Sequence, residues 1–244
     1  EDVIRKDLTS LNETYAASPT TRARLIGKSF TGVAGPFGVG KSTLTDAVIE
    51  IEPSIRPIHT TTTRHRKPED PAGFKTADEG ITFESMYSAV LNGELVNYSV
   101  IPGGDVYGTY PEDFPAEHTI GPFLPSSMDH IWRAGFDRHA FVYIVTAGDL
   151  WRSYVENNRT HLPEKTFQAR VREAKDSLNF ALDNSDMLYF IENQDGEEGK
   201  YRAAEAIARI ALGKPEEGIG ENAAITYLKQ MQDIANELGE RHGL

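Results

Sequence analysis

The chain has 244 residues, of which 39% are hydrophobic and 25% charged, and this composition is that of a folded globular protein rather than a disordered or fibrous one. Its 25 Lys and Arg residues against 37 Asp and Glu residues give a formal charge of −12, which excludes broad non-specific binding to nucleic acid or anionic membranes. The absence of Cys excludes disulfides, thiol catalysis and thiolate metal sites.

The sequence carries no recognisable membrane or secretion signal. No apolar run approaches the roughly 18 residues that a membrane span needs. The N-terminus has no apolar segment behind a basic start, which is the pattern of a signal peptide. We therefore expect a cytoplasmic protein that binds neither membrane nor nucleic acid.

A polar leader is followed by a short strand, a turn and a helix. The helix begins at Lys41, carries apolar residues at the helical period and ends before Pro53. The leader covers residues 1–27, and the strand, the turn and a second strand after the helix are expected over residues 30–34, 35–40 and 56–61.

The next part of the chain predicts a loop and several short strands. Residues 64–80 are rich in Pro, Gly and charge, which is typical of a loop. Strands separated by turns are then expected over residues 81–83, 95–100 and 106–110.

Three short and nearly continuous apolar runs follow, at residues 119–124, 140–145 and 187–191. Runs of this kind predict strands buried on both faces of a parallel sheet. Between the last two runs, apolar residues from Phe167 to Ala181 recur in steps of four and three, which indicates a long helix. The alternation of strands and helices favours an α/β protein with a central parallel sheet.

The tail after Gly213 contains an amphipathic helix. Amphipathic helices mostly complete the core of their own domain, so we favour packing within the chain over a dimer contact, and both monomer and homodimer stay open. The apolar face consists of Ala224, Tyr227, Met231, Ile234 and Leu238.

The turn after the first strand carries the phosphate-binding motif G-x-x-x-x-G-K-[ST]. Its glycines let the backbone curl so that N–H groups point at a phosphate, and the following helix adds its positive end. Lys41 would reach the β- and γ-phosphates and Ser42 would ligate Mg²⁺, so the motif predicts a nucleoside triphosphate site, with ATP as the expected donor. The residues of this site are Gly35, Pro36, Phe37, Gly38, Val39, Gly40, Lys41, Ser42 and the adjoining Thr43.

A cluster of cations follows the second strand. Arg64, Arg66 and Lys67 lie within four residues of one another and directly after a run of threonines. Such a cluster could be a solvated loop. In an acidic protein, beside hydroxyls and just beyond a strand end, it fits a second anion pocket better, because Arg suits bidentate phosphate contacts.

Taken together, the motifs resemble those of the guanylate kinase family over residues 28–212. The shared features are a T-T-R-x-x-R segment, a strand like G-E-F-x-E-W, a Y-G-T turn, a lid helix carrying arginines and a buried strand that ends in Asn. In this chain they lie at residues 62–67, 93–98, 107–109, 167–178 and 189–193.

The resemblance implies a role for particular side chains. On the acceptor side, cations and hydroxyls hold a phosphorylated acceptor: Arg64 with Arg66 or Lys67, Tyr107, and Thr60 and Asn97 near the base. On the donor side, lid arginines close over the transferring phosphoryl group and one Asn lies near the adenine: Arg170, Arg159 or its neighbour Arg152, and Asn193.

Three departures from the family pattern fall on the acceptor and Mg²⁺ side. Asn97 stands where the family has an acidic residue that reads guanine, and Ile81 stands where it has a phosphate-binding Tyr. The stretch 119–127 has no counterpart of the family's D-x-D pair, which would leave Mg²⁺ on Ser42, phosphates and waters. An acceptor other than GMP follows as an expectation.

We therefore expect a three-layer P-loop NTPase fold of the α/β class, with a central parallel sheet, a small mixed acceptor-binding insert and a helical lid. The expected reaction moves the γ-phosphoryl of ATP, with Mg²⁺, onto the phosphate of a nucleoside monophosphate. A sugar-phosphate kinase and a non-catalytic interaction module are the alternatives. The catalytic domain covers 28–212, with its core at 28–60, 111–149 and 173–212, the insert at 61–110, the lid at 150–172, and extensions at 1–27 and 213–244.

Overall fold

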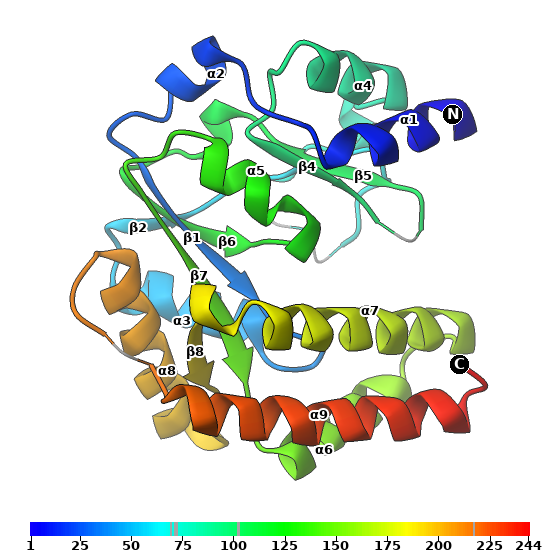
Figure 1. Cartoon of the computed structure of the whole chain (residues 1–244), viewed down its shortest axis with the longest axis vertical. Coiled ribbons are helices and arrows are strands. Elements are labelled where there is room, and N and C mark those ends of the chain that lie inside the picture. Colours follow the sequence, from blue (N-terminus) through cyan, green and yellow to red (C-terminus); the bar gives the residue numbers. More distant parts are fainter. Residues whose placement is uncertain (69, 71–72, 102, 217) are drawn as a thin grey trace. The chain divides into compact units, whose positions relative to one another are not determined.

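The structure is a computed structural model that describes residues 1–68, 70, 73–101, 103–216 and 218–244 (Figure 1). The chain divides into two compact units. Unit 1 comprises residues 1–30, 56–119 and 123–139, and unit 2 comprises residues 31–55, 120–122 and 140–244.

A central five-stranded parallel sheet is flanked by helices, which confirms the expected α/β class and P-loop type of fold. The strand order is β2-β6-β1-β7-β8. All six residues of β1 are buried, as are the last six of β7, so the apolar runs of the sequence reflect strands covered on both faces. The strands are β1 Ser29–Ala34, β2 Ile55–Pro57, β6 His118–Pro122, β7 Arg138–Val145 and β8 Tyr189–Glu192.

Unit 1 contains a small antiparallel sheet with the order β3-β5-β4. These strands are β3 Thr61–Thr62, β4 Asn97–Val100 and β5 Val106–Thr109. The helices are α1 Asp2–Asn12, α2 Pro19–Ala23, α4 Phe83–Leu91 and α5 Met128–Arg133, with short 3₁₀ turns η1 Ala77–Glu79, η2 Pro111–Asp113 and η3 Pro125–Ser127.

The N-terminal segment belongs to the core of unit 1. Helix α1 packs on α4 and β4 (Figure 1), and Leu8 on α1 is fully buried in one cluster with Met86 and Tyr98. The Tyr98 hydroxyl donates to the Leu8 carbonyl oxygen at 2.7 Å, and the Tyr15 hydroxyl donates to the Leu95 carbonyl oxygen at 2.6 Å. The polar leader of the sequence therefore holds the small sheet from one side.

Unit 2 places its helices in packed pairs. Helix α7 lies along α9, α9 also contacts α6, and α3 packs on α8 (Figure 1). The helices are α3 Lys41–Ile51, α6 Gly148–Arg159, α7 Glu164–Asp183, α8 Gly196–Ala211 and α9 Glu221–Arg241, with a 3₁₀ turn η4 Ser185–Met187.

The C-terminal helix covers its own unit. Its predicted apolar face is buried at Ala224, Met231, Ile234 and Leu238, and the Arg152 guanidinium of α6 is paired with Glu237 of α9. This favours the interpretation in which α9 completes the core of the chain. No helix among the described residues has the length and apolar character needed to cross a bilayer.

Two predicted strands differ from the structure. Residues 81–83 are not a strand, because the Thr82 side chain accepts from the Ser85 amide and begins helix α4 at Phe83. The predicted strand over residues 56–61 is instead two short strands in different sheets, β2 and β3, because the chain leaves the large sheet after Pro57.

Candidate functional site

The loop between β1 and α3 has the backbone geometry of a phosphate cradle. Gly38 and Gly40 have φ angles of 76° and 91°, a left-handed conformation that residues with a side chain rarely adopt. Helix α3 begins at Lys41, directly after Gly40, and within the described part of the chain no side chain caps its first turn. Its first amides are thus open to an anion, at the end of the helix where the dipole is positive.

Lys41 is folded back onto this loop. Its ammonium donates to the carbonyl oxygens of Gly35 at 2.6 Å and Pro36 at 2.9 Å. Burial lowers the pKa of Lys41 to about 8, while the charge of Glu173 on α7 raises it and that of Arg170 lowers it. Unit 2 thus brings Lys41 and the predicted lid residue Arg170 into one electrostatic environment.

Two side chains that lie far along the chain hold the loop in shape. The indole Nε1 of Trp151 donates to the Phe37 carbonyl oxygen at 2.9 Å. The Nδ2 of Asn193 donates to the Val39 carbonyl oxygen at 2.9 Å, and a Cβ added at Gly40 would lie 2.5 Å from that same nitrogen. Asn193 therefore closes the loop directly, whatever its relation to an adenine.

The sequence did not single out Trp151 or Glu173 as site residues. Trp151 is fully buried and packs edge-on against the Phe37 ring with 6.3 Å between ring centroids. Glu173 follows Arg170 by one helical turn, and their side chains are paired at 3.0 Å. That spacing was the one signal in the sequence that could have pointed to Glu173.

The predicted lid, residues 150–172, covers most of α6 and the first half of α7. Arg159 ends α6, is exposed, and holds its guanidinium carbon 5.7 Å from the centroid of the Phe167 ring. Arg152 is instead committed to α9, because both of its terminal nitrogens donate to Glu237. Arg159 is accordingly the better candidate of the two for contact with a ligand.

Ser42 and Thr43 are exposed in the first turn of α3. The Ser42 hydroxyl makes no hydrogen bond within the described residues and is therefore available as a ligand. Outside the five undescribed positions, no group of three or more His, Asp or Glu side chains could hold a metal ion. This donor set fits Mg²⁺ bound through one hydroxyl and phosphate oxygens, since Mg²⁺ keeps several of its waters. It does not fit a cage made of protein ligands alone.

In unit 1, the predicted anion-binding cations lie just beyond β3. The Arg64 Nε donates to the Tyr107 hydroxyl at 2.7 Å, so two predicted acceptor residues touch each other. The two terminal nitrogens of Arg64 donate to the two carboxylate oxygens of Asp70 at 2.7 and 2.5 Å. These contacts raise the pKa of the guanidinium still further and lower that of Asp70 to about 2.

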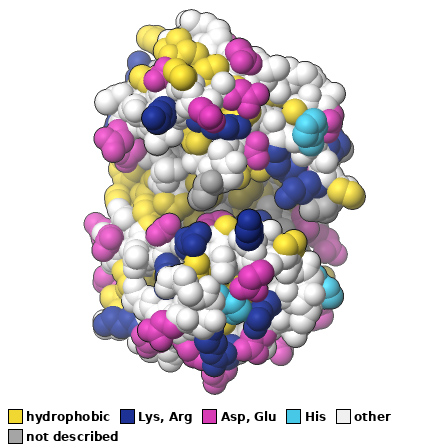
Figure 2. All heavy atoms as spheres, turned by 90° about the vertical axis from the view of Figure 1, so that its right-hand side faces the viewer, with side chains coloured by type: hydrophobic (Ala, Val, Ile, Leu, Met, Phe, Trp, Pro, Cys, Tyr) yellow, Lys and Arg dark blue, Asp and Glu magenta, His cyan; other side chains and the backbone are white. Residues whose placement is uncertain are grey.

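The neighbouring cations also have acidic partners. Arg66 is paired with Glu79 at 2.7 Å, and His65 lies 2.7 Å from Asp78. Lys67 is exposed, and its backbone N–H donates to Asp70 at 2.7 Å. On the face drawn in Figure 2, Lys and Arg side chains are likewise interspersed with Asp and Glu rather than gathered into a single basic patch.

The remaining predicted acceptor residues lie on the small sheet or beside it. The Asn97 side-chain oxygen accepts from the Thr109 hydroxyl on the opposite strand, which leaves the Asn97 amide nitrogen as a donor. Thr60 is half-buried, and its carbonyl oxygen accepts from the Lys75 amide at 2.8 Å. The adjacent Thr61 hydroxyl is buried and finds no hydrogen-bond partner among the described residues.

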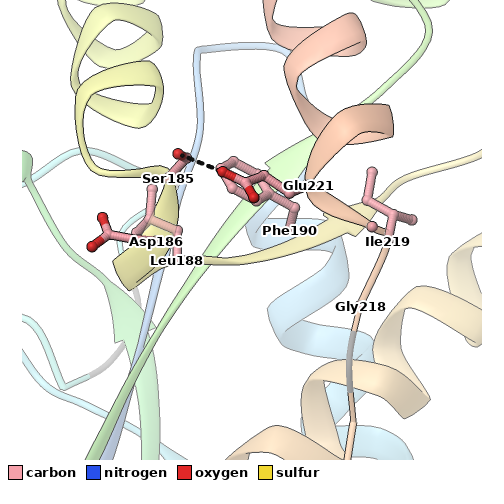
Figure 3. A pocket seen from close by; sticks show the side chains of 8 residues that line it. Ser185, Asp186, Leu188, Phe190, Gly218, Ile219 and Glu221 are labelled. Atoms are coloured by element: carbon pink, nitrogen blue, oxygen red, sulfur yellow. Dashed lines mark hydrogen bonds between the residues drawn. The ribbon is translucent and has the colours of Figure 1, made fainter.

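A separate pocket of about 280 Å³ lies beside the start of α9 (Figure 3). The Ser185 hydroxyl donates to the Glu221 carboxylate at 3.3 Å across it. Its described lining carries the two carboxylates of Asp186 and Glu221 and no Lys or Arg, so it does not suit a phosphate.

The parallel sheet, with a glycine-rich loop between β1 and α3 and a lysine at the helix start, defines a fold of the P-loop class. Comparison with protein-family models and with curated proteins finds no match. Among solved structures, the fold is similar to that of guanylate kinase from Anaplasma phagocytophilum, with a TM-score of 0.49, 14% sequence identity, and coverage of 76% of this chain and 84% of that chain. Identity at this level says nothing about the reaction, so the function is inferred from this chain's own residues.

Proposed function

We propose that this protein is a phosphotransferase that moves the γ-phosphoryl group of ATP onto the phosphate of a small phosphorylated acceptor, foremost a nucleoside monophosphate. The observation that carries the proposal is the loop between β1 and α3. It has left-handed glycines, an uncapped helix start and Lys41 directed at the loop interior.

The chemistry needs positioning and neutralisation of charge more than covalent catalysis. Lys41 would exchange the Gly35 and Pro36 carbonyl oxygens for phosphate oxygens, and the open amides of α3 would hold the β-phosphate. Mg²⁺ held by Ser42 would neutralise charge on the phosphates. Arg170, which shares the electrostatic environment of Lys41, and Arg159 would approach the migrating group.

The acceptor is assigned to unit 1, where Arg64 and Tyr107 lie in contact. Asn97 presents an amide nitrogen, because its oxygen accepts from Thr109. A donor at this position suits a base edge that accepts, whereas the guanine edge read by an acidic residue donates. We therefore infer a monophosphate other than GMP.

The test is ADP formation from ATP and Mg²⁺ with a panel of nucleoside monophosphates and sugar phosphates. At least one acceptor is expected to raise ADP formation well above the rate with ATP alone. Lys41→Ala is expected to abolish it, and Lys229→Ala, which removes an exposed lysine from α9, is expected to leave it unchanged. ATP binding without turnover on any acceptor would contradict the proposal and favour a binding module. Turnover with GMP would contradict the assignment of Asn97.

A further inference from the structure

We propose that Asp70 is an internal carboxylate ligand of Arg64, and that the acceptor's phosphate binds to Arg64 by displacing Asp70. The inference rests on the proposed function, because it concerns the anion that Arg64 takes. It adds a residue that determines what the acceptor site accepts.

The first observation is geometric. A guanidinium offers two parallel N–H groups along one edge, and a carboxylate or a phosphate can accept both. In Arg64 this edge is filled by the two oxygens of Asp70, while Nε is taken by Tyr107. The Arg64 Nη1 also donates to the His65 carbonyl oxygen, at 2.7 Å. A phosphate therefore cannot make a two-pronged contact with Arg64 while Asp70 is in place.

The second observation is burial. The Arg64 and Asp70 side chains are only 13% and 7% exposed, so their pair is shielded from solvent in a way that the surface pairs of the chain are not. The Arg64 guanidinium carbon also lies 5.2 Å from the centroid of the Phe74 ring. The Arg64 guanidinium is thus held in a shielded place by a tyrosine hydroxyl and an aromatic ring, with one edge turned to an oxyanion.

The third observation is the charge around Asp70. Among the residues that the structure describes, the groups that face its carboxylate are the Arg64 guanidinium, the charge of Arg66 and the Lys67 backbone N–H. All three favour an anion at this position. A phosphate dianion carries more charge than a carboxylate and can use the same donors, so it is a stronger ligand of the same site. A singly charged acceptor would compete with Asp70 on equal terms and gain little.

The consequence is selectivity by displacement. Without a ligand, Asp70 fills this edge of Arg64, and only a ligand with a doubly charged phosphate displaces it. Removing the charge of Asp70 should therefore strengthen phosphate binding. If Asp70 served only to position Arg64, its removal would weaken phosphate binding instead.

The experiment compares the binding of inorganic phosphate to the full chain as wild type, Asp70→Asn and Asp129→Asn by titration calorimetry at pH 7. Asp129 is exposed and paired with Arg133, so its variant removes the same charge from unit 1 at another place. Asp70→Asn is expected to bind phosphate about tenfold more tightly than the wild type, and Asp129→Asn to bind as the wild type does. Unchanged or weaker binding by Asp70→Asn would overturn the proposal.

A spectroscopic measurement separates displacement from a general charge effect. In carboxyl ¹³C NMR spectra of the wild type, the Asp70 signal is assigned by its absence in Asp70→Asn. Addition of phosphate is expected to shift it as the carboxylate leaves Arg64 for water. A bound phosphate with an unmoved Asp70 signal would overturn the proposal. Neither measurement contains ATP. A negative result in either would therefore leave the Lys41-dependent ATP site untouched, and a failure of ATP binding would leave both phosphate measurements interpretable.

Discussion

Replacing Lys41 by Met is expected to stabilise the free protein while it abolishes nucleotide binding. Desolvation lowers the pKa of Lys41 from its ordinary value of 10.5 to about 8, so the folded chain at pH 7 carries a costly, half-buried charge. At about 1.4 kcal/mol per pH unit, this difference corresponds to a penalty of about 3 kcal/mol. The lost bonds to the Gly35 and Pro36 carbonyl oxygens offset about 1 kcal/mol each, which leaves a net gain of about 1 to 2 kcal/mol.

The pH dependence has a definite sign. The folded-state pKa of Lys41 lies below the unfolded-state value, so between pH 8 and 10.5 the unfolded chain binds more protons and stability rises with pH. The penalty is complete below pH 8 and disappears as the pH rises toward 10.5. At pH 9.5 about 1.4 kcal/mol of it remains, so the advantage of the Met variant is expected to vanish there.

The assay is urea unfolding of wild type, Lys41→Met and Lys229→Met at pH 7 and 9.5, together with ATP binding by calorimetry. Lys229 is exposed on α9 and serves as the control for loss of one charge. If Lys41→Met is less stable than the wild type at pH 7, or if the difference between them does not shrink at pH 9.5, the burial argument is wrong.

Two further variants test the loop and the lid. Gly40→Ala is expected to lower the free energy of unfolding by about 2 to 3 kcal/mol, from left-handed strain of about 1 to 2 kcal/mol and loss of the bond made by the Asn193 amide of about 1 kcal/mol. Gly196→Ala, with φ at 83° and no described atom within 4 Å of an added Cβ, is expected to lose only the strain part in urea unfolding. Equal losses for the two variants would refute the contact between Gly40 and Asn193. Arg170→Gln is expected to lower kcat by about a hundredfold or more with little change in ATP affinity. Arg202→Gln on α8 should leave kcat unchanged, and an equal kcat for both variants would exclude Arg170 from the reaction.

The sequence predicted well the elements that depend on local pattern. The strand, the glycine turn and the helix start at Lys41 lie within 13 residues of one another, and each follows from residue types that allow few other conformations. The prediction of a strand over residues 81–83 was wrong because the apolar residues Ile81 and Phe83 alternate with Thr82 as they would in a strand. The Thr82 cap, which begins a helix there, outweighs so short a pattern.

The contacts that complete the site could not be read from local pattern. Trp151 reaches the Phe37 carbonyl oxygen across 114 positions of sequence, and Asn193 reaches that of Val39 across 154. Such pairs depend on the order of strands in the sheet, which a single sequence does not encode visibly. The Arg64 and Asp70 pair is only six positions apart. Even so, nothing in a charged, proline-rich segment states which acid pairs with which cation.

Lys41 and Arg64 share one property that bears on any ligand of this protein. Each is satisfied by the chain itself, Lys41 by two carbonyl oxygens and Arg64 by a carboxylate and a phenol oxygen. Buried cations need such partners, because an unpaired charge in a shielded place is costly. A ligand therefore gains only the difference between its own contacts and those it replaces. That difference is larger for a polyphosphate, whose several charged oxygens replace neutral carbonyls at Lys41, than for a single phosphate that replaces a carboxylate at Arg64. Tight donor binding and weaker acceptor binding follow from the partners that each cation already has.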